Sequence, residues 1–522
     1  MTKIIVEVSK YVLLLLMVIF TMQSFIALKR KTEESRSGVM GVQIVLMVVF
    51  NFVAYFVMYL QTGDINMILL YGGVVIYILA IVGLYRLLYK NASMMLLNNM
   101  CMLLSIGLVI QARLGTSTAV RQLIIASIST VISLIIPVLI RKAKVFRKLT
   151  WVYGIVGILL LVAVLGFSKI TRGASLSLSI GGITFQFSEF VKITVVFFMA
   201  GMLQSVTSFR QVFKVTVIAG IHVVLLVLSR DLGAALIYFV AYIVMVFVAT
   251  RKARYALLGL GGMAVASVGA YKLFSHIRVR VNVWRDPFAD YEGTGYQIVQ
   301  ALFGVCAGGW FGTGLFAGSP TMIPLAKEDF TFAAICEEMG ILFAICLILL
   351  CMAMFLLIVN IAMKLDKPFY KLVAIGLGAE YAFQVFLTVG GTTKFIPMTG
   401  ITLPLVSYGG SSVMCTMIML AIIQGLYIIR KDEDAEVEEL RRQKQLEQER
   451  RQGRRPEYPA QQPGRPVQQQ PGRAGQQSGR PVQQQPGRAG QQSGRPVQQP
   501  GSAGDDDLER KIREQTEKSL NW

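Results

Sequence analysis

Long apolar runs recur along the sequence from near its start to about residue 430. Each run is about 18 to 25 residues long, which is the length that a helix needs to cross the roughly 30 Å hydrocarbon layer of a membrane. The chain has 522 residues, and 54% of them are hydrophobic. We therefore expect an all-α polytopic membrane protein, and the runs exclude a soluble protein.

About thirteen candidate membrane spans can be placed in these runs. They cover residues 11–28, 38–60, 67–85, 94–112, 119–140, 150–168, 187–205, 213–229, 232–249, 255–274, 330–360, 369–390 and 403–428. Basic clusters occur in alternate connections, for example at 141–148 and 251–254. The positive-inside rule places these connections in the cytoplasm, so the N-terminus is expected outside and the C-terminal tail inside. Residues 275–329 then form the one large outer loop.

The formal net charge of +21 falls mainly on short connections between the spans, where it indicates orientation and the binding of anionic ligands. Nucleic-acid binding is not needed to explain it. The six cysteines and two histidines show no spacing that is typical of zinc ligands or disulfides. The sequence contains no phosphate-loop motif, so we expect no bound nucleotide.

The chain changes character after residue 430. Residues 430–455 are predicted to form a charged cytoplasmic helix. Residues 456–504 consist of Gln, Gly, Pro and Arg repeats, which cannot bury a core and therefore predict a disordered tether. Residues 505–522 either form a short helix that docks on another protein or remain a solvated tail with no specific partner.

Residues 278–314, within this outer loop, are too polar and too rich in glycine to span lipid. Irregular backbone near a membrane persists where it is buried in protein or lines a wet cavity, so we expect this loop to fold back over the helices. Its arginines, Arg278, Arg280 and Arg285, suit an anionic phosphate or diphosphate. The alternative is that each of them only extends toward lipid headgroups.

Four carboxylates gather in the stretch KEDFTFAAICEEMG, residues 327–340. Asp329 is predicted to begin a helix, since an apolar run follows it without interruption, and it is either a functional acid or simply the N-cap. The start of a helix also offers backbone N–H groups to a phosphate. Glu337 and Glu338 lie about two turns deeper, and we favour a structural role for them over a functional one.

Polar groups also interrupt two other apolar runs. Glu189 and Lys192, three residues apart on one helix, can form an ion pair that either holds helices together or meets a charged ligand. Prolines and glycines break the run at residues 392–412, which predicts either a broken helix that exposes polar groups or a re-entrant turn that only packs. The polar side chains of this stretch include Lys394, Thr399, Ser407, Ser411 and Ser412.

The sequence resembles the SEDS family of cell-wall polymerases, represented by FtsW, RodA and SpoVE. The resemblance lies in three blocks, which occur in the order DPFADYEGTGYQIVQALFGVCAGGWFGTGL, DFTFAAICEEMG and PMTGITLPLVSYGGSS. FQFSEFVK and RDLGAAL are similar to two further blocks of that family. The resemblance covers residues 95–428. It implies a ten-span core, here residues 94–429, preceded by about three extra transmembrane helices in residues 1–93.

The resemblance implies that the protein polymerises lipid II, the undecaprenyl-diphosphate-linked disaccharide-pentapeptide, on the outer face of the bacterial cytoplasmic membrane. Asp329 matches the family's essential aspartate and would activate the acceptor hydroxyl. The implied substrate-binding residues are Arg280, Lys394, Glu189, Lys192, Tyr296, Gln297, Ser407 and Ser411. The resemblance also implies a class B penicillin-binding protein as partner, contacts of the tail with other division or elongation proteins, and help from a divalent cation, Mg²⁺ or Mn²⁺.

The chain departs from the family's pattern at several positions. Glu328 stands where a threonine is usual, Phe187 where a proline is usual, Ser177 in place of a tryptophan and Thr388 in place of an asparagine. Two other functions remain open, namely a lipid II flippase, which also needs a polar cavity between broken helices, and a non-catalytic scaffold for a penicillin-binding protein. A carrier has no need of an acid at the outer rim, whereas a polymerase does.

Overall fold

The computed structural model describes residues 2–30, 33–142, 149–167, 178–180, 183–206 and 208–451. The chain divides into two compact units, Met1–Asp432 and Glu433–Trp522. In the second unit only residues 433–451 are described, and all of them are helical. The predicted repeats and the predicted short C-terminal helix therefore lie outside the described residues. The first unit contains every predicted span.

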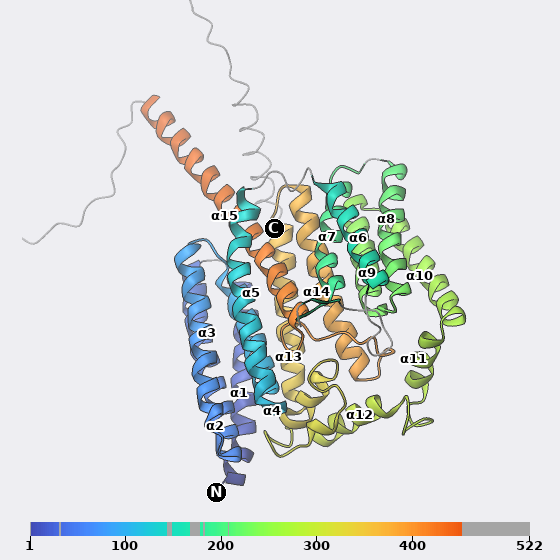
Figure 1. Cartoon of the computed structure of the whole chain (residues 1–522). Coiled ribbons are helices and arrows are strands. Elements are labelled where there is room, and N and C mark those ends of the chain that lie inside the picture. Colours follow the sequence, from blue (N-terminus) through green and yellow to red (C-terminus); the bar gives the residue numbers. More distant parts are fainter. Residues whose placement is uncertain are drawn as a thin grey trace, which may run out of the picture. The chain divides into compact units, whose positions relative to one another are not determined.

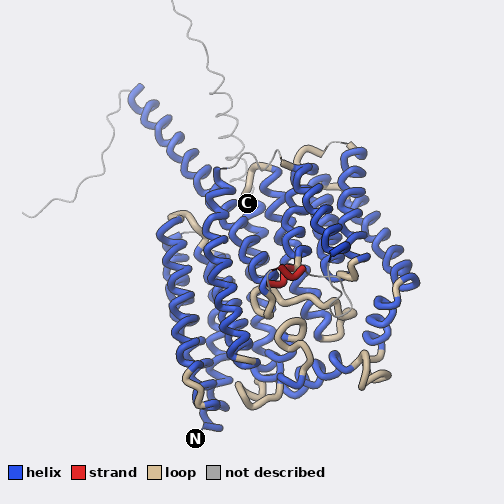
Figure 2. The backbone as a smooth tube through the Cα atoms, in the orientation of Figure 1, coloured by secondary structure: helices blue, strands red, loops and turns tan. Residues whose placement is uncertain are grey.

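Helices make up almost all of the first unit, as Figures 1 and 2 show. In chain order the elements are α1 (Thr2–Lys29), α2 (Glu33–Thr62), α3 (Asn66–Leu88), α4 (Met94–Leu114), α5 (Thr116–Lys142), α6 (Thr150–Phe167), β1 (Leu178–Ile180), β2 (Ile183–Phe185), α7 (Phe187–Leu203), α8 (Phe209–Leu228), α9 (Leu232–Thr250), α10 (Ala253–Leu273), α11 (Ser275–Arg285), α12 (Tyr296–Gly308), η2 (Pro320–Met322), α13 (Thr331–Met363), α14 (Pro368–Thr392) and α15 (Gly410–Arg451). The predicted helical fold class is confirmed, with one short hairpin in addition.

Eleven helices in the described part of the chain are long and apolar enough to cross a membrane. They are α1 to α5, α8, α9, α10, α13, α14 and α15. The two other predicted spans correspond to α6 and α7, which have 18 and 17 residues. The protein is a multi-pass membrane protein, as predicted, while the count of about thirteen spans stays a prediction.

The three N-terminal helices pack closely on the helices that follow them. α1 contacts α2 and α13, and α2 contacts α3 and α4. In Figure 1 these helices stand side by side. Because α1, α2, α3, α5 and α13 all contact α4, that helix is buried along nearly its whole length. The extra helices predicted for residues 1–93 are therefore an integral part of the first unit.

α13 contains a break that its apolar sequence does not reveal. Gly340 has φ 86° and ψ 167° inside the helix, a conformation that glycine adopts without the penalty that a side chain would bring. The backbone N–H groups of Thr313 and Gly314 donate to the carbonyl oxygens of Glu337 and Glu338, both at 2.9 Å. The prediction of an uninterrupted helix here is wrong, because part of the large outer loop packs against the break.

About half of the large loop is helical. α10, which has no buried residue, leads into α11, and α12 follows after a turn. Hydrogen bonds from α11 to backbone oxygens at positions 394 and 399 hold it against the segment between α14 and α15. The loop therefore folds back over the helices, as predicted. In Figure 1, α11 and α12 lie at the end of the first unit where α1 begins.

A short hairpin lies in the connection between α6 and α7. β1 and β2 pair in antiparallel fashion, with Leu178 opposite Phe185 and Ile180 opposite Ile183. Figure 2 shows the hairpin among the surrounding helices. The sequence predicts only a loop for this connection, and its unusual Ser177 lies outside the described residues.

Candidate active site

Asp329 lies in the turn that leads into α13. The helix begins at Thr331, and its N-cap residue is Phe330, without a side-chain cap. The prediction that Asp329 begins the helix is therefore wrong, and so is the alternative that it is simply the N-cap. The backbone N–H groups of Glu328 and Phe330 donate to the carbonyl oxygen of Leu325 at 2.9 and 3.2 Å. Asp329 therefore lies within this turn, two residues before the first residue of the helix.

Arg280 and Asp329 meet on the same short backbone segment. Nη1 of Arg280 donates to the carbonyl oxygens of Met398 at 3.2 Å and Thr399 at 2.9 Å. The next residue, Gly400, has φ 76°, and the position that a Cβ would take there is 3.7 Å from Oδ2 of Asp329. The structure thus brings a guanidinium from α11 and a carboxylate from the start of α13 to residues 398–400.

The charge on Arg280 is balanced by two carboxylates. α11 lies outside the membrane-spanning helices. Burial lowers the pKa of the Arg280 guanidinium, and the negative charges of Asp231 and Asp329 oppose that shift. Because the ordinary pKa of an arginine is very high, the guanidinium stays protonated in proteins. Arg280 is therefore a fixed cation in the field of Asp329.

Asp231, the second of these carboxylates, connects two helices. It is the N-cap of α9, where its Oδ1 accepts a hydrogen bond from the N–H of Ala234 at 3.1 Å. Ser188 Oγ on α7 donates to its Oδ2 at 2.9 Å. Tyr238 on α9 donates in turn to the carbonyl oxygen of Ser188 at 2.6 Å. Asp231 therefore caps α9 and fixes it to the start of α7.

Glu189 and Lys192 form the ion pair that their spacing allows. Lys192 Nζ lies 2.6 Å from Glu189 Oε2, and both side chains are buried. The same ammonium donates to Gln384 Oε1 on α14 at 3.1 Å, and Nε2 of Gln384 donates to the carbonyl oxygen of Thr402 at 3.0 Å. The pair therefore joins α7, α14 and the segment between α14 and α15. A role of the pair in binding substrate stays a prediction.

Glu380 on α14 belongs to the same buried group, although the sequence interpretation did not single it out. It lies one helical turn before Gln384, is 1% exposed and interacts electrostatically with Lys192. Neither of its carboxylate oxygens has a hydrogen-bond partner among the described residues. A signal was present in the sequence, because a lone glutamate inside an apolar span is a functional candidate by default.

Lys394 lies beside the segment that holds Arg280. Its backbone has φ 59°, and its carbonyl oxygen accepts a hydrogen bond from Trp284 Nε1 at 3.2 Å. The side chain is partly exposed, and its ammonium forms no ion pair within the part of the chain that the structure describes. Lys394 thus presents a cation at the same end of α14 that α11 covers.

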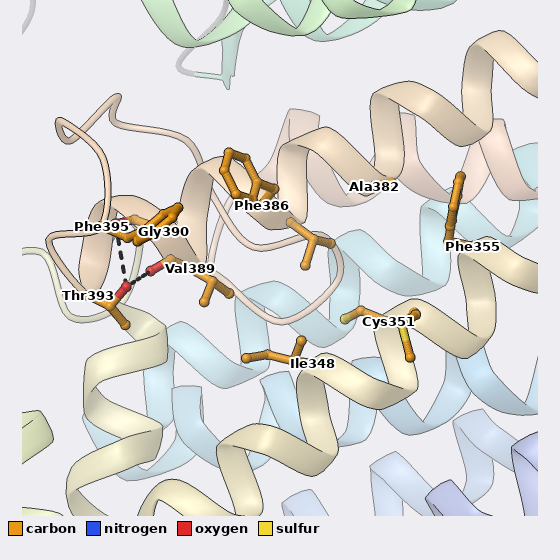
Figure 3. Close-up of a pocket in the computed structure, with 11 residues that line it drawn as sticks. Ile348, Cys351, Phe355, Ala382, Phe386, Val389, Gly390, Thr393 and Phe395 are labelled. Atoms are coloured by element: carbon orange, nitrogen blue, oxygen red, sulfur yellow. Dashed lines mark hydrogen bonds between the residues drawn. The ribbon is translucent and has the colours of Figure 1, made fainter. Parts of the chain in front are cut away.

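An apolar pocket lies between α13 and α14 (Figure 3). Its volume is about 320 Å³. Its lining residues are Ile348, Cys351, Met352, Phe355, Ala382, Val385, Phe386, Val389, Gly390, Thr393 and Phe395. The hydroxyl of Thr393 donates to the carbonyl oxygen of Val389 at 2.8 Å and so is used within the helix. No charged side chain lines the pocket, although two of its lining residues, Thr393 and Phe395, flank Lys394.

Glu337 and Glu338 support the loop that packs against the break in α13. Arg113 Nε lies 2.7 Å from Glu338 Oε1, and the exposed fractions of the two side chains are 9% and 0%. The same oxygen accepts a hydrogen bond from the N–H of Phe316 at 3.1 Å. Oε1 of Glu337 accepts the N–H of Ser319. Both glutamates therefore hold backbone of the outer loop, in line with the structural role that the sequence analysis favours.

The other predicted substrate-binding residues have varied surroundings. Tyr296 begins α12 and packs its ring 6.0 Å from that of Tyr291, and Gln297 is exposed. Ser407 Oγ accepts the N–H of Leu403 at 3.0 Å within a turn. Ser411 Oγ accepts the N–H of Gln186 at 3.1 Å. Ser407 thus holds local backbone, whereas Ser411 holds the backbone just before α7, and contacts of these residues with substrate stay predictions.

Three of the four unusual residues are described, and Glu328 lies in the turn before α13. Phe187 is the first residue of α7 and is partly buried. Thr388 is buried on α14, and its hydroxyl hydrogen-bonds with the carbonyl oxygens of Gln384 and Ile401, both at 3.0 Å. Thr388 therefore ties α14 to Ile401, the residue that follows Gly400.

The fold and the site define a multi-pass helical membrane protein with a charged centre at one end of its spans. The chain belongs to the family of FtsW, RodA and SpoVE, described as cell cycle proteins, whose match covers residues 85–431. The SEDS resemblance that the sequence shows is thereby confirmed.

Relatives named RodA and stage V sporulation protein E match parts of this chain. The peptidoglycan glycosyltransferase RodA of Mycobacterium tuberculosis strain H37Rv is 43% identical over 203 residues, which are 39% of this chain and 43% of that protein. The chain therefore spans about two fifths of the length of that relative. RodA of Mycobacterium leprae is 31% identical over 59% of this chain and 69% of its own length. The stage V sporulation protein E of Bacillus subtilis is 33% identical over 51% and 74%.

Solved structures share the fold. RodA of Thermus thermophilus matches with a TM-score of 0.51 at 22% identity, over 65% of this chain and 97% of its own. A chain from a peptidoglycan synthase complex that coordinates polymerization and crosslinking matches with a TM-score of 0.56 at 24% identity, over 65% and 98%. Both solved chains are thus covered almost completely by about two thirds of this one.

Proposed function

We propose that this protein is a peptidoglycan glycosyltransferase that polymerises lipid II into glycan strands. Asp329 takes the proton from the 4-hydroxyl of the acceptor GlcNAc, and that oxygen forms a bond to C1 of the donor MurNAc. The bond between C1 and the diphosphate oxygen breaks, and undecaprenyl diphosphate leaves. The observation that carries the proposal is the meeting of Asp329 and Arg280 at residues 398–400.

The leaving diphosphate requires positive charge close to the acid. A guanidinium has five N–H donors, so the two bonds that Nη1 of Arg280 makes to backbone oxygens leave other donors for a phosphate. Lys394 adds a second cation next to the same segment. Charged donors that are fixed before the reaction stabilise developing negative charge without the cost of reorganisation. Arg280 and Lys394 therefore take the role of neutralising the leaving group.

A divalent cation, Mg²⁺ or Mn²⁺, is part of what the family resemblance implies. Among the described residues, no three His, Cys, Asp or Glu side chains are grouped so that they could hold a metal ion. The residues present therefore do not fit a dedicated protein metal site, and the mechanism assigns no step to a cation.

The reaction takes place at the outer face in this proposal, with the N-terminus outside and the C-terminal tail in the cytoplasm. Lys10 near the start of α1 hydrogen-bonds with Gly312 of the large loop, so the two share one end of the unit. At the other predicted face, the basic Arg141 forms an ion pair with Asp432 at 2.9 Å. Since clusters of basic residues favour the cytoplasmic side, the cluster at 141–148, which begins with Arg141, supports the proposed orientation.

We further propose that a class B penicillin-binding protein is the partner and that the tail contacts other division or elongation proteins. The fold that this chain shares with a member of a complex for polymerization and crosslinking supports a crosslinking partner. A co-purification of the two membrane proteins tests the pairing.

The activity is tested with purified protein and lipid II, with and without the penicillin-binding protein. We expect glycan polymer on a gel and no transfer of lipid II between the leaflets of vesicles. Transfer without polymer would establish the carrier function instead. Absence of both under every cation condition would leave the scaffold function and overturn the proposal.

A further inference from the structure

The first helix of the chain reaches the loop that packs against the break in α13. Lys10 Nζ donates to the carbonyl oxygen of Gly312 at 3.2 Å, and its side chain is only 11% exposed. Glu7 holds the same ammonium at 2.6 Å. One residue further on, the ring of Tyr11 packs 5.4 Å from the ring of Phe311. α1 therefore contacts residues 311–312 through both a charge and an aromatic ring.

The contact between α1 and the loop leaves no space for a side chain at two glycines of the loop. Gly314 has φ 98°, and the position that a Cβ would take there is 2.8 Å from Cγ1 of Val6 on α1. At Gly312, with φ 81°, the same position is 2.3 Å from the carbonyl oxygen of Glu338. Only glycine fits both the backbone conformation and the space at these positions. The loop is thus enclosed between α1 on one side and the break in α13 on the other.

The loop in turn completes the hydrogen bonding of the broken helix. Beyond the bonds that Thr313 and Gly314 donate to positions 337 and 338, the N–H groups of Ile341 and Leu342 donate to the carbonyl oxygens of Gly309 and Trp310 at 3.0 and 3.2 Å. A break leaves backbone groups that must find other partners when buried. Residues 309–314 supply them, so this loop fixes the far end of the short helical stretch that follows the Asp329 turn.

Buried polar side chains hold α1 and α2 in register with α4. Ser24 Oγ donates to Asn99 Oδ1 at 2.9 Å, and Gln43 Nε2 donates to Ser24 Oγ at 3.0 Å. Asn98 Nδ2 donates to Gln43 Oε1 at 3.1 Å. Further along, Asn51 Nδ2 donates to Ser105 Oγ at 3.1 Å. Hydrogen bonds between apolar helices specify which helix faces meet, so α1 is held in one position relative to the core.

We propose that Lys10 is a positioning residue for Asp329 and acts through Gly312 and the loop 309–314. The proposal rests on the proposed function, because Asp329 is the acid of that reaction. Lys10 lies before residue 85, where the family match begins. In this proposal, a residue of α1, outside the part of the chain that matches the family, helps to position Asp329.

The test uses the full chain with Lys10→Met, which removes the donor but keeps the length of the side chain. Hydrogen exchange at the amides of Thr313 and Gly314 is measured, together with kcat and KM for lipid II. We expect exchange at these amides to rise by about tenfold and kcat to fall by about fivefold, with KM within about twofold of the wild type. Exchange in α4 serves as the internal reference for the folded state.

Two control variants separate positioning from a general change of α1. Lys10→Arg keeps a charged donor and should restore most of kcat. Lys3→Met removes the same charge from an exposed position on α1 and should leave exchange and kcat unchanged.

Unchanged exchange at Thr313 and Gly314 in Lys10→Met would overturn the proposal, whatever happens to kcat. Faster exchange with an unchanged kcat would also overturn it, because the loop would then not position the acid. If the wild-type protein forms no polymer, the proposed function fails, while the exchange measurement still decides whether Lys10 holds the loop.

Discussion

Arg280 donates a 2.9 Å hydrogen bond to the carbonyl oxygen of Thr399, the residue that precedes Gly400. Because Asp329 lies against Gly400, a cation and an acid from distant parts of the sequence share one backbone support. A shift of residues 398–400 would therefore move both groups, so the geometry of the site depends on the backbone of these residues as well as on the two side chains.

Gly400→Ala tests this dependence. A side chain in the left-handed conformation costs about 1 to 2 kcal/mol of unfolding free energy, and the added methyl group would lie against Asp329. We expect this variant to lose glycan polymerisation by more than about tenfold. Gly63→Ala is the matched control, because Gly63 has φ 67° and nothing within 4 Å of the position of a Cβ. Equal activities of the two variants would contradict the account.

Arg113→Ala should destabilise the protein strongly. It leaves the buried carboxylate of Glu338 without its cation, a change that typically costs about 3 to 5 kcal/mol. Arg141→Ala breaks an ion pair whose side chains are 57% and 30% exposed, and such pairs contribute less than about 1 kcal/mol. Unfolding in mixed micelles measures both. A similar loss for the two variants would show that the Arg113 pair does not support the outer loop.

Glu380→Gln should be nearly neutral for stability. The carboxylate makes no hydrogen bond to any described residue, so an amide of similar shape loses little, less than about 1 kcal/mol. Glu189→Gln instead leaves Lys192 buried without its ion-pair partner, which should cost about 3 kcal/mol. If Glu380→Gln costs as much as Glu189→Gln, then Glu380 belongs to the ion-pair network as an obligatory anion.

The outer segment should lose stability in acid through His276, near the start of α11. Burial lowers the pKa of this histidine below its ordinary value of 6.5, and the charges of Arg230 and Arg280 lower it further. A group whose pKa is lower in the folded state favours folding above its unfolded-state pKa. That contribution disappears as the pH falls through the folded-state value. Hydrogen exchange of α11 against pH measures the effect, and His276→Gln should remove it.

Features that depend on local spacing could be predicted from the sequence. The spans follow from the length of the apolar runs, and the pair of Glu189 and Lys192 follows from an i, i+3 spacing that any helix brings together. The position of Arg280 on a loop that folds back follows from backbone polarity, because exposed loop backbone is not tolerated in lipid.

Contacts between distant residues could not be predicted in this way. Arg113 and Glu338 are 225 positions apart, and one sequence does not tell which of several acids an arginine meets. The break at Gly340 could not be predicted, because the hydropathy of a segment indicates its burial but not its backbone dihedral angles. Glu380 is a different case. A lone acid in an apolar span can be seen in the sequence, but only the structure shows that it lies near Lys192 and Gln384.

The central claim is that Asp329 activates the acceptor hydroxyl. The most direct measurement compares lipid II polymerisation by purified Asp329→Asn with that by Glu292→Gln, which neutralises an exposed acid in the same outer loop. The account predicts that Asp329→Asn loses activity by at least about 100-fold while still binding lipid II, and that Glu292→Gln polymerises like the wild type. Wild-type rates from Asp329→Asn would contradict it.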